Sequence, residues 1–393
     1  MVPPQLELAL AAMLWTSLAL VAYAYVGYPL LLDWLAGLFG RRSCPPDRSG
    51  DSLPTVSLLI AALNEEKWIA DRVLNALHQD YPPDRLRVVI ASDGSTDRTC
   101  QIVEGLAARY PGRVILYDFS QRRGKATVLN SVLPELTSEI VALSDANTFF
   151  ARDAVRNLAR WFRDKSIVAV CGKLNLVDAA TGRNVDGLYW RYENFLKERE
   201  GRLGALLGAN GAVYAIRQAD YFPIPGDTII DDFVIPLQMK LRTGGRIVYD
   251  AAAEATEETP PRVADEFRRR TRIGAGGFQS LARLWPLALP SAGWTALAFV
   301  SHKLLRWFAP LFLVLALASN LLLLHRPEYR LLFALQASFY AAAAVGALLP
   351  GNSTAIRGLR LATLFTSMNA ALALGFWRWL AGLQRGTWQR TAR

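Results

Sequence analysis

Cysteine and histidine are scarce in this chain. Its 393 residues include three of each, namely Cys44, Cys100, Cys171, His78, His302 and His325. No two of them have the spacing of zinc ligands, so we expect no zinc site. Three widely separated cysteines also give no disulfide framework, which suits a reducing compartment.

Nucleic-acid-binding motifs are missing as well. The net charge is +10, but no zinc-finger, RNA-motif or arginine-comb pattern accompanies it. Much of the excess positive charge lies near apolar runs at the two ends, where Lys and Arg face anionic lipid in membrane proteins. We therefore predict a lipid bilayer as a partner and no nucleic acid.

A P-loop is not present either. Gly124-Lys125-Ala126 looks like the end of one, but Phe119 stands where that motif needs glycine and Ala126 where it needs serine or threonine. Two interpretations of Lys125 are left. It contacts a donor phosphate from the start of a helix, or it is an ordinary solvated lysine.

Long apolar runs are what the chain has in excess. Residues 8–32 carry no charge and are long enough to cross a bilayer. A secretory signal peptide fits poorly, because the run is too long and Glu7, rather than a basic residue, precedes it. Arg41, Arg42 and Arg48 follow the run, which predicts that the next segment is cytoplasmic.

The C-terminal part has the same character. Residues 266–285 are basic and partly amphipathic, which predicts an interfacial helix. Three apolar stretches follow at residues 307–324, 331–349 and about 359–379. One span before the middle and three after it leave the C-terminus outside, whereas the arginines beyond residue 384 favour the inside. Either the last stretch crosses only in part, which we favour, or the charge bias fails here.

The middle of the chain alternates between strand and helix patterns. Predicted strands and helices follow one another at residues 56–61, 65–78, 86–91, 97–108, 114–117, 125–133 and 139–143. Such alternation indicates an α/β, Rossmann-like fold with a mostly parallel sheet that helices cover on both faces. Ligands then bind at the carboxyl ends of the strands, where Asn64, Asp93 and Asp145 fall.

These patterns divide the chain into six predicted segments. The linker among them is inferred from the many Pro, Ser and Asp residues before residue 55. The segments are an N-terminal transmembrane helix (1–40), the linker (41–54), an α/β catalytic domain (55–260), interfacial helices (261–303), a C-terminal transmembrane region (304–383) and a basic tail (384–393).

Polar turns follow the first and second predicted strands. Asn64 suits the N-cap of a helix, and Glu65 and Glu66 suit its first turn. A role of Glu65 in nucleoside binding is the alternative, which this motif alone does not favour. In the second turn Asp93 precedes Gly94, which permits a tight turn. A turn role and a bond to a nucleoside are equally supported for Asp93.

Acidic residues farther along offer metal and base chemistry. Asp145 directly follows an apolar strand, where a carboxylate can hold Mg²⁺ or Mn²⁺, and Asn147 could add a carbonyl oxygen. A plain turn is the alternative, but we favour function for Asp145. Asp231 and Asp232 follow an apolar pair. One of them can act as a general base, or both belong to the first turn of a helix.

A basic cluster opens the predicted interfacial helix. Arg268, Arg269, Arg270 and Arg272 stand within five residues. Anchoring to lipid headgroups is one interpretation, and binding of a donor diphosphate by one of the arginines is the other. Both can hold for different members of the cluster.

In this order and spacing, the motifs resemble those of family-2 glycosyltransferases with a GT-A fold. The likeness is to the membrane branch with hyaluronan, cellulose, chitin and poly-N-acetylglucosamine synthases and ceramide glucosyltransferase, and it covers residues from about 55 to 307. It implies that Ala61, Glu65 and Asp93 bind the nucleoside and that Lys125 lies near the donor. It also implies that Asp145 is the first acid of an Asp-x-Asp metal motif.

Further roles follow from the same resemblance. Asp232 matches the final acid of the Glu-Asp motif and is the implied base. Asn210 and Gly211 match the acceptor site. In the Gln-x-x-Arg-Trp motif, Arg269 aligns with the glutamine and Arg272 with the arginine, which implies donor binding.

Several positions depart from the family pattern. Asn147 replaces the second acid of the metal motif, Asp231 replaces glutamate, Arg269 replaces glutamine and Ile273 replaces tryptophan. The metal and base assignments survive these changes. The missing tryptophan, which in processive members lies near the acceptor sugar, puts processive polymerisation in doubt.

The sequence therefore predicts an inverting glycosyltransferase with its catalytic domain on the cytoplasmic side of a bacterial inner membrane. It would move a sugar from a nucleotide sugar, a UDP-sugar by resemblance, to a membrane-associated glycan or lipid-linked acceptor. A processive polysaccharide synthase that extrudes its chain is the first alternative. An inactive scaffold subunit of a polysaccharide-export complex, with oligomer or complex partners, is a second, and a nucleotidyltransferase a third.

Overall fold

The computed structural model describes residues 3–41, 53–177, 187–258, 263–349, 354–384 and 386. The chain divides into two compact units. One comprises Leu32–Pro261, Ala282–Ala298 and Arg385–Arg393, and the other Met1–Leu31, Arg262–Leu281 and Phe299–Gln384. The predicted linker and basic tail lie almost entirely outside the described residues, and the six predicted segment boundaries stay a prediction.

The first unit is an α/β domain. Its strands are β1 (Val56–Ala62), β2 (Leu86–Asp93), β3 (Val114–Phe119), β4 (Ile140–Asp145), β5 (Thr148–Phe150), β6 (Ile167–Val177), β7 (Tyr214–Arg217) and β8 (Arg246–Glu258). Its main helices are α3 (Ile69–Leu77), α4 (Thr99–Arg109), α5 (Lys125–Val132), α6 (Ala154–Ala159), α7 (Leu188–Arg202), α8 (Asp231–Thr243) and α10 (Trp294–Ala298). Short 3₁₀ turns occupy Leu133–Glu135, Arg160–Arg163, Gln218–Asp220, Trp285–Ala288 and Pro290–Ala292.

The strands form one eight-stranded sheet in the order β3-β2-β1-β4-β7-β6-β8-β5. The first four strands in sequence, β1 to β4, are parallel to one another, as the strand–helix alternation predicts. After β4 the alternation ends, and β7 runs antiparallel to both β4 and β6. The expectation of a mostly parallel GT-A-like sheet is confirmed for the first half, and the second half is mixed.

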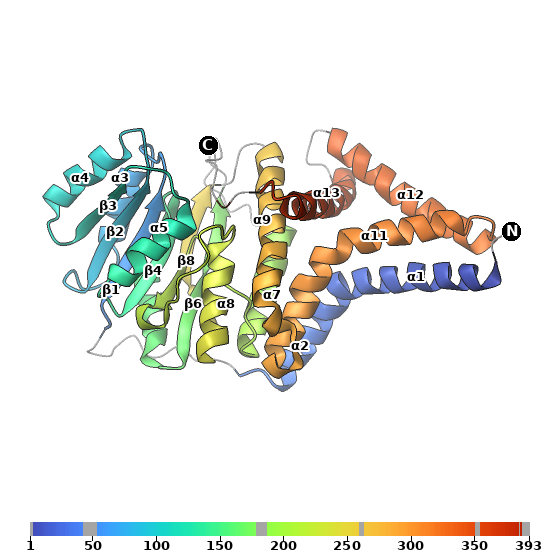
Figure 1. Cartoon of the computed structure of the whole chain (residues 1–393), viewed down its shortest axis with the longest axis horizontal. Coiled ribbons are helices and arrows are strands. Elements are labelled where there is room, and N and C mark those ends of the chain that lie inside the picture. Colours follow the sequence, from blue (N-terminus) through green and yellow to red (C-terminus); the bar gives the residue numbers. More distant parts are fainter. Residues whose placement is uncertain are drawn as a thin grey trace. The chain divides into compact units, whose positions relative to one another are not determined.

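The two faces of the sheet have different partners. Val56, Leu58 and Ile60 pack with α3, α4 and α6 in one hydrophobic core. Because side chains alternate along a strand, the residues at odd-numbered positions in β2 and β4 point to the other face. Asp93 and Asp145 are therefore directed to the face where α5 and α8 lie over the strands (Figure 1).

The predicted helix at residues 65–78 begins later than expected. The backbone N–H of Glu65 donates to the Thr99 hydroxyl at 2.8 Å, and that of Glu66 donates to the Asp97 carboxylate at 3.2 Å. These bonds hold the segment in a turn, so α3 starts only at Ile69. The prediction of Asn64 as an N-cap was wrong, because its backbone is left-handed (φ 55°) and its side chain accepts from the N–H of Thr96.

The second unit contains the long apolar helices. Its elements, some of which begin or end in the first unit, are α1 (Pro4–Ala22), a π-helix (Tyr23–Gly27), α2 (Tyr28–Leu38), α9 (Val263–Leu284), a second π-helix (Phe299–Leu304), α11 (Leu305–Leu322), α12 (Pro327–Leu348) and α13 (Thr354–Leu380). In Figure 1, α1 and α11 run side by side, and Leu10 and Leu14 pack there against Ala316 and Leu323.

Four helical segments of the described chain are long and apolar enough to cross a membrane. They are Pro4–Leu38, Trp294–Leu322, Pro327–Leu348 and Gly358–Leu380. The predicted apolar stretches fall within or overlap them, but the second helical segment begins well before the predicted stretch at residues 307–324. The side on which each end lies, and partial crossing of the last helix, stay predictions.

Candidate active site

Lys125 joins two acidic motifs that are far apart in the sequence. Its Nζ lies 2.9 Å from Asp145 Oδ1 and 3.5 Å from Asp231 Oδ2. The carboxyl end of β4 supplies Asp145, the first turn of α8 supplies Asp231, and the first residue of α5 is Lys125 itself. The two carboxylates are therefore separated by no more than the sum of these distances.

The lysine is held there as a cation. Its side chain is only 15% exposed, against 32% for Asp145 and 12% for Asp231. Burial by itself lowers the pKa of Lys125, but the charges of Asp145, Asp231 and Asp232 and the hydrogen bond to Asp145 together outweigh it, and the pKa stands above the ordinary value. Of the two interpretations of Lys125, the solvated lysine is wrong, and the predicted donor contact is not tested.

Asp232 lies beside this group and is fixed by the backbone. Its Oδ2 accepts a hydrogen bond from the N–H of Gly211 at 2.9 Å, and its carbonyl accepts from the N–H of Ala209 at 3.0 Å. Burial raises the pKa of Asp232, and so does the negative charge of Asp231, while Lys125 and the Gly211 N–H lower it by less. The carboxyl of Asp232 thus binds a proton more readily than an ordinary aspartate.

Asp93 reaches the site through a loop. It is fully buried, and its two oxygens accept from the N–H groups of Arg123 at 2.6 Å and Gly124 at 2.9 Å. Gly124 has φ 89° and directly precedes Lys125. Asp93 therefore fixes the start of α5, and its predicted bond to a nucleoside stays a prediction.

The remaining donor-side candidates differ in position. Ala61 pairs in register with Asp145, which places it at the same edge of the sheet. Glu65 lies in the turn after β1, next to the turn after β2. Arg269 and Arg272 lie on α9 in the other compact unit, so their predicted donor-binding role also stays a prediction.

Asn147 and Asn210 extend the site on either side. The Asn147 amide donates to Glu257 Oε1 on β8 at 3.2 Å, which leaves its carbonyl oxygen as the predicted metal ligand. The side chain of Asn210 accepts from Lys197 of α7 and donates to the carbonyl of Gly172 at 2.9 Å. The structure thus brings Asp145, Asp231 and Asp232 together, with Lys125 and Gly211 among them.

Comparison with known families agrees with this geometry. Residues 57–221 match the family model described as glycosyl transferase family 2. The chain has a family-2 glycosyltransferase domain. The match begins in β1 and ends after β7, so it includes Asp93, Lys125 and Asp145.

Two curated relatives of the glycosyltransferase domain act in lipid and polysaccharide synthesis by name. The chain is 27% identical over 290 residues to a beta-monoglucosyldiacylglycerol synthase of a Nostoc species, covering 72% of this chain and 61% of that one. It is 25% identical over 244 residues to the poly-beta-1,6-N-acetyl-D-glucosamine synthase of Staphylococcus aureus, covering 61% and 58%. The chain thus spans about 60% of the length of these relatives.

A solved structure shares the fold over nearly the whole chain. It is the mannosyltransferase PcManGT from Pyrobaculum calidifontis, in complex with GDP-Man and Mn²⁺. The TM-score is 0.69 at 24% identity, covering 94% of this chain and 99% of that one. The expected GT-A-like α/β fold next to apolar helices is therefore confirmed.

Two buried side chains of the glycosyltransferase domain escaped the sequence analysis. The hydroxyl of Tyr214 on β7 has no hydrogen-bond partner in the described chain, and burial, with the charge of Asp231 next, raises its pKa well above the ordinary value. Arg72 of α3 is fully buried, and burial lowers its pKa to about 9 while the charge of Asp145 opposes this shift. For Arg72, the one signal in the sequence was the presence of an arginine on the apolar face of a predicted helix.

Replacement of Gly211 by alanine is expected to impair the site. A Cβ there would lie 3.0 Å from Asp232 Oδ2, so this carboxylate must shift. Because small displacements of reacting groups are costly, we expect turnover to fall about 10- to 100-fold. The measurement is kcat of Gly211→Ala against Gly105→Ala, where the added methyl group meets nothing within 4 Å. Equal kcat values would show that Asp232 does not need this position.

Proposed function

We propose that the chain is an inverting glycosyltransferase that moves a sugar from a nucleotide sugar to a membrane-associated glycan or lipid-linked acceptor. The observation that carries the proposal is the contact of Lys125 with both Asp145 and Asp231, beside Asp232. It gathers the acidic motifs at the carboxyl end of a parallel strand, where such sheets bind ligands. The names of the two curated relatives support the acceptor class.

Asp232 is the proposed base. Its Oδ2 is held by the Gly211 N–H, which leaves Oδ1 to accept the proton of an acceptor hydroxyl. The hydroxyl oxygen then attacks the anomeric carbon of the donor, and the bond to the nucleoside diphosphate breaks. Asp231 and Lys125 set the charge around Asp232: the first raises its pKa and the second lowers it.

The residues fit a divalent cation that arrives with the donor. The described residues contain no group of three or more His, Cys, Asp or Glu side chains placed to hold a metal. Mg²⁺ is commonly bound by one or two carboxylates together with water and substrate phosphates, and Asp145 with the Asn147 carbonyl matches that need. Bound there, Mg²⁺ or Mn²⁺ would neutralise the charge of the departing diphosphate. The Mn²⁺ of PcManGT supports this assignment.

The donor test uses the full chain in vesicles with a panel of nucleotide sugars. We expect release of a nucleoside diphosphate from one donor class, UDP-sugars first, and its loss by at least 100-fold in Asp145→Asn or with EDTA. Asp118→Asn, an exposed acid at the end of β3, is the matched control. Absence of release from every donor, with folded protein and metal present, would contradict the enzyme proposal and favour the scaffold.

Two finer points belong to the same proposal. We propose that the catalytic unit faces the cytoplasm, supported by the arginines after the first span. We also propose addition of a single sugar or a short chain, supported by Ile273 in place of the family's tryptophan. The length distribution of products from radiolabelled donor separates this outcome from processive synthesis.

A further inference from the structure

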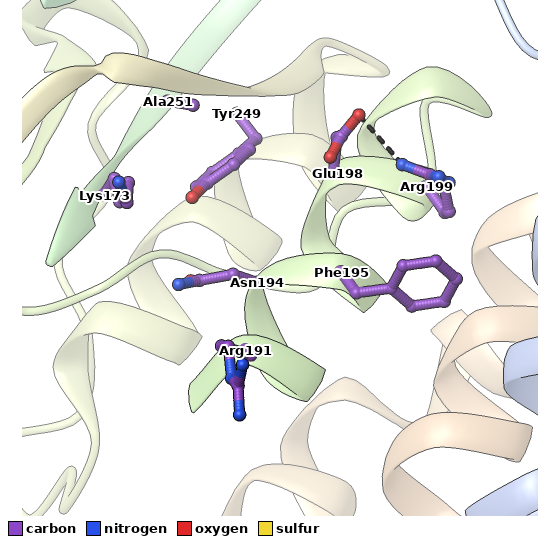
Figure 2. A pocket seen from close by; sticks show the side chains of 8 residues that line it. All are labelled: Lys173, Arg191, Asn194, Phe195, Glu198, Arg199, Tyr249 and Ala251. Atoms are coloured by element: carbon purple, nitrogen blue, oxygen red, sulfur yellow. Dashed lines mark ion pairs between the residues drawn. The ribbon is translucent and has the colours of Figure 1, made fainter. Parts of the chain in front are cut away.

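A polar cavity lies between α7 and the strands β6 and β8 (Figure 2). Its volume is about 620 Å³, which is within the range of about 300–1,000 Å³ for small-molecule sites. It is lined by Lys173, Arg191, Asn194, Phe195, Glu198, Arg199, Tyr249 and Ala251.

Three of the lining side chains have hydrogen-bonding groups that no other described residue uses. Among the described residues, no hydrogen-bond or ion-pair partner is found for the side chains of Arg191, Asn194 and Tyr249. The Oδ1 atom of Asn194 is buried and has no partner among the described residues, which costs free energy unless a ligand or water satisfies it. In Figure 2 the amide of Asn194 and the hydroxyl of Tyr249 point to the same side of the cavity.

The other charged groups at the cavity are neutralised. Lys173 Nζ lies 3.0 Å from Glu254 Oε1, and Arg199 lies 2.9 Å from Glu198 and 2.8 Å from Asp33. Only Arg191 adds a cation without an acidic partner in the described part of the chain. The cavity therefore offers hydrogen-bond donors and acceptors and the aromatic ring of Tyr249, with little net charge. Such a lining favours a neutral, hydroxyl-rich ligand over a dianion.

The cavity is connected to the proposed base by short contacts. Asn210 bonds to Lys197, a residue of α7 that does not itself line the cavity, and to the carbonyl of Gly172, which precedes Lys173 on β6. The next residue, Gly211, donates to Asp232. Asn210 thus contacts the helix and one of the strands that line the cavity, and it directly precedes the residue that fixes the base.

We propose that this cavity binds a sugar ring of the acceptor, so that the protein prefers an acceptor that already carries a sugar. The proposal rests on the proposed function and adds the substrate class. The Asn194 amide and the Tyr249 hydroxyl bond the ring hydroxyls, and the ring of Tyr249 packs against its apolar face. Arg191 donates to hydroxyl oxygens at the edge of the sugar ring.

The test compares acceptors and variants in one vesicle assay. Vesicles contain either diacylglycerol or glucosyl-diacylglycerol, and transfer from the active donor is followed. We expect a KM at least tenfold lower for the glycosylated lipid. Tyr249→Phe and Asn194→Ala should each raise the KM for the glycosylated lipid about three- to tenfold. This is the change expected when one or two neutral hydrogen bonds to the sugar are lost. The KM for the donor should change by less than twofold.

Tyr110→Phe is the matched control, since it removes the hydroxyl of a half-buried tyrosine at the end of α4. Thermal unfolding checks that each variant is folded. A second readout is binding of methyl β-glucoside and methyl N-acetyl-β-glucosaminide by saturation-transfer NMR, which needs no turnover and should weaken in Tyr249→Phe.

Each outcome decides one of the two proposals. Donor turnover with unchanged acceptor KM and unchanged glycoside binding in both variants would overturn the cavity assignment and leave the proposed function intact. Equal use of diacylglycerol, or displacement of the glycoside by inorganic phosphate, would also overturn it. Absence of any donor turnover would contradict the proposed function, and the NMR result would still decide whether the cavity binds a sugar.

Discussion

Asp232→Asn is expected to lower kcat by about 10²- to 10⁴-fold, because asparagine cannot accept the acceptor proton and base catalysis has this magnitude. Asparagine retains a carbonyl oxygen for the Gly211 N–H, so the site should keep its shape. Binding of the donor should therefore persist. The measurements are kcat by release of nucleoside diphosphate and donor affinity by calorimetry.

The control for this substitution is Asp220→Asn. Asp220 is a partly exposed acid with an ion pair to Arg217 at 3.6 Å, and its change should leave kcat within twofold. Near-normal turnover of Asp232→Asn would remove Asp232 from the base role. The acidic limb of the wild-type pH profile is a further check. Since burial raises the pKa of Asp232, activity should fall at a higher pH than an ordinary aspartate requires.

Lys125→Met is expected to destabilise the domain by about 3–5 kcal/mol near neutral pH, the cost of removing one partner from a buried ion pair. The substitution leaves Asp145, Asp231 and Asp232 without their common cation. The pKa of Asp232 should rise further, because Lys125 lowers it in the wild type. The acidic limb of the activity profile should therefore move to higher pH.

The pH dependence of stability has a defined sign in this variant. Native Asp232, with its raised pKa, binds its proton more tightly than the unfolded chain does. Its contribution to the free energy of unfolding is favourable at low pH and is lost as the pH rises through the raised value. The destabilisation of Lys125→Met should thus shrink on acidification, and thermal unfolding across pH measures it.

A divalent cation gives an independent readout. Lys125 occupies an oxygen of Asp145 that is the proposed metal ligand. Without the lysine, Mn²⁺ should raise Tm more than it does in the wild type. Lys173→Met, which breaks a half-exposed pair, should cost only about 0–1 kcal/mol. An unchanged Tm in Lys125→Met, with or without Mn²⁺, would show that the three carboxylates do not form one charged group.

Much of the first half of the domain was predictable from local pattern. The strands at β1 to β4 and the helix beginning at Lys125 were expected within a few residues, because apolar runs and helical spacing are local signals. The start of α3 was misplaced, since the hydrogen bonds that delay it come from Asp97 and Thr99, more than thirty residues away. Sequence periodicity contains no information on such a contact.

The site divides in the same way. The chemical types of Asp145 and Asp232, and their places after a strand and near a helix start, were readable from the sequence. The position of Lys125 between them was not readable. It depends on the φ of 89° at Gly124 and on the hydrogen bonds by which the N–H groups of Arg123 and Gly124 bind Asp93. The cavity under α7 also escaped notice, since its walls come from three elements whose residues show no common spacing.

The sequence by itself determined the class of fold, the apolar segments and the acidic motifs, because each depends on neighbours within a few residues. Only the tertiary structure decided that Lys125 connects the motifs and that the amide of Asn194 and the phenol of Tyr249 face one cavity. The physical reason is that these contacts join β4, α5 and α8, or α7 and β8, and pairing between distant elements is set by how the whole sheet and its helices pack.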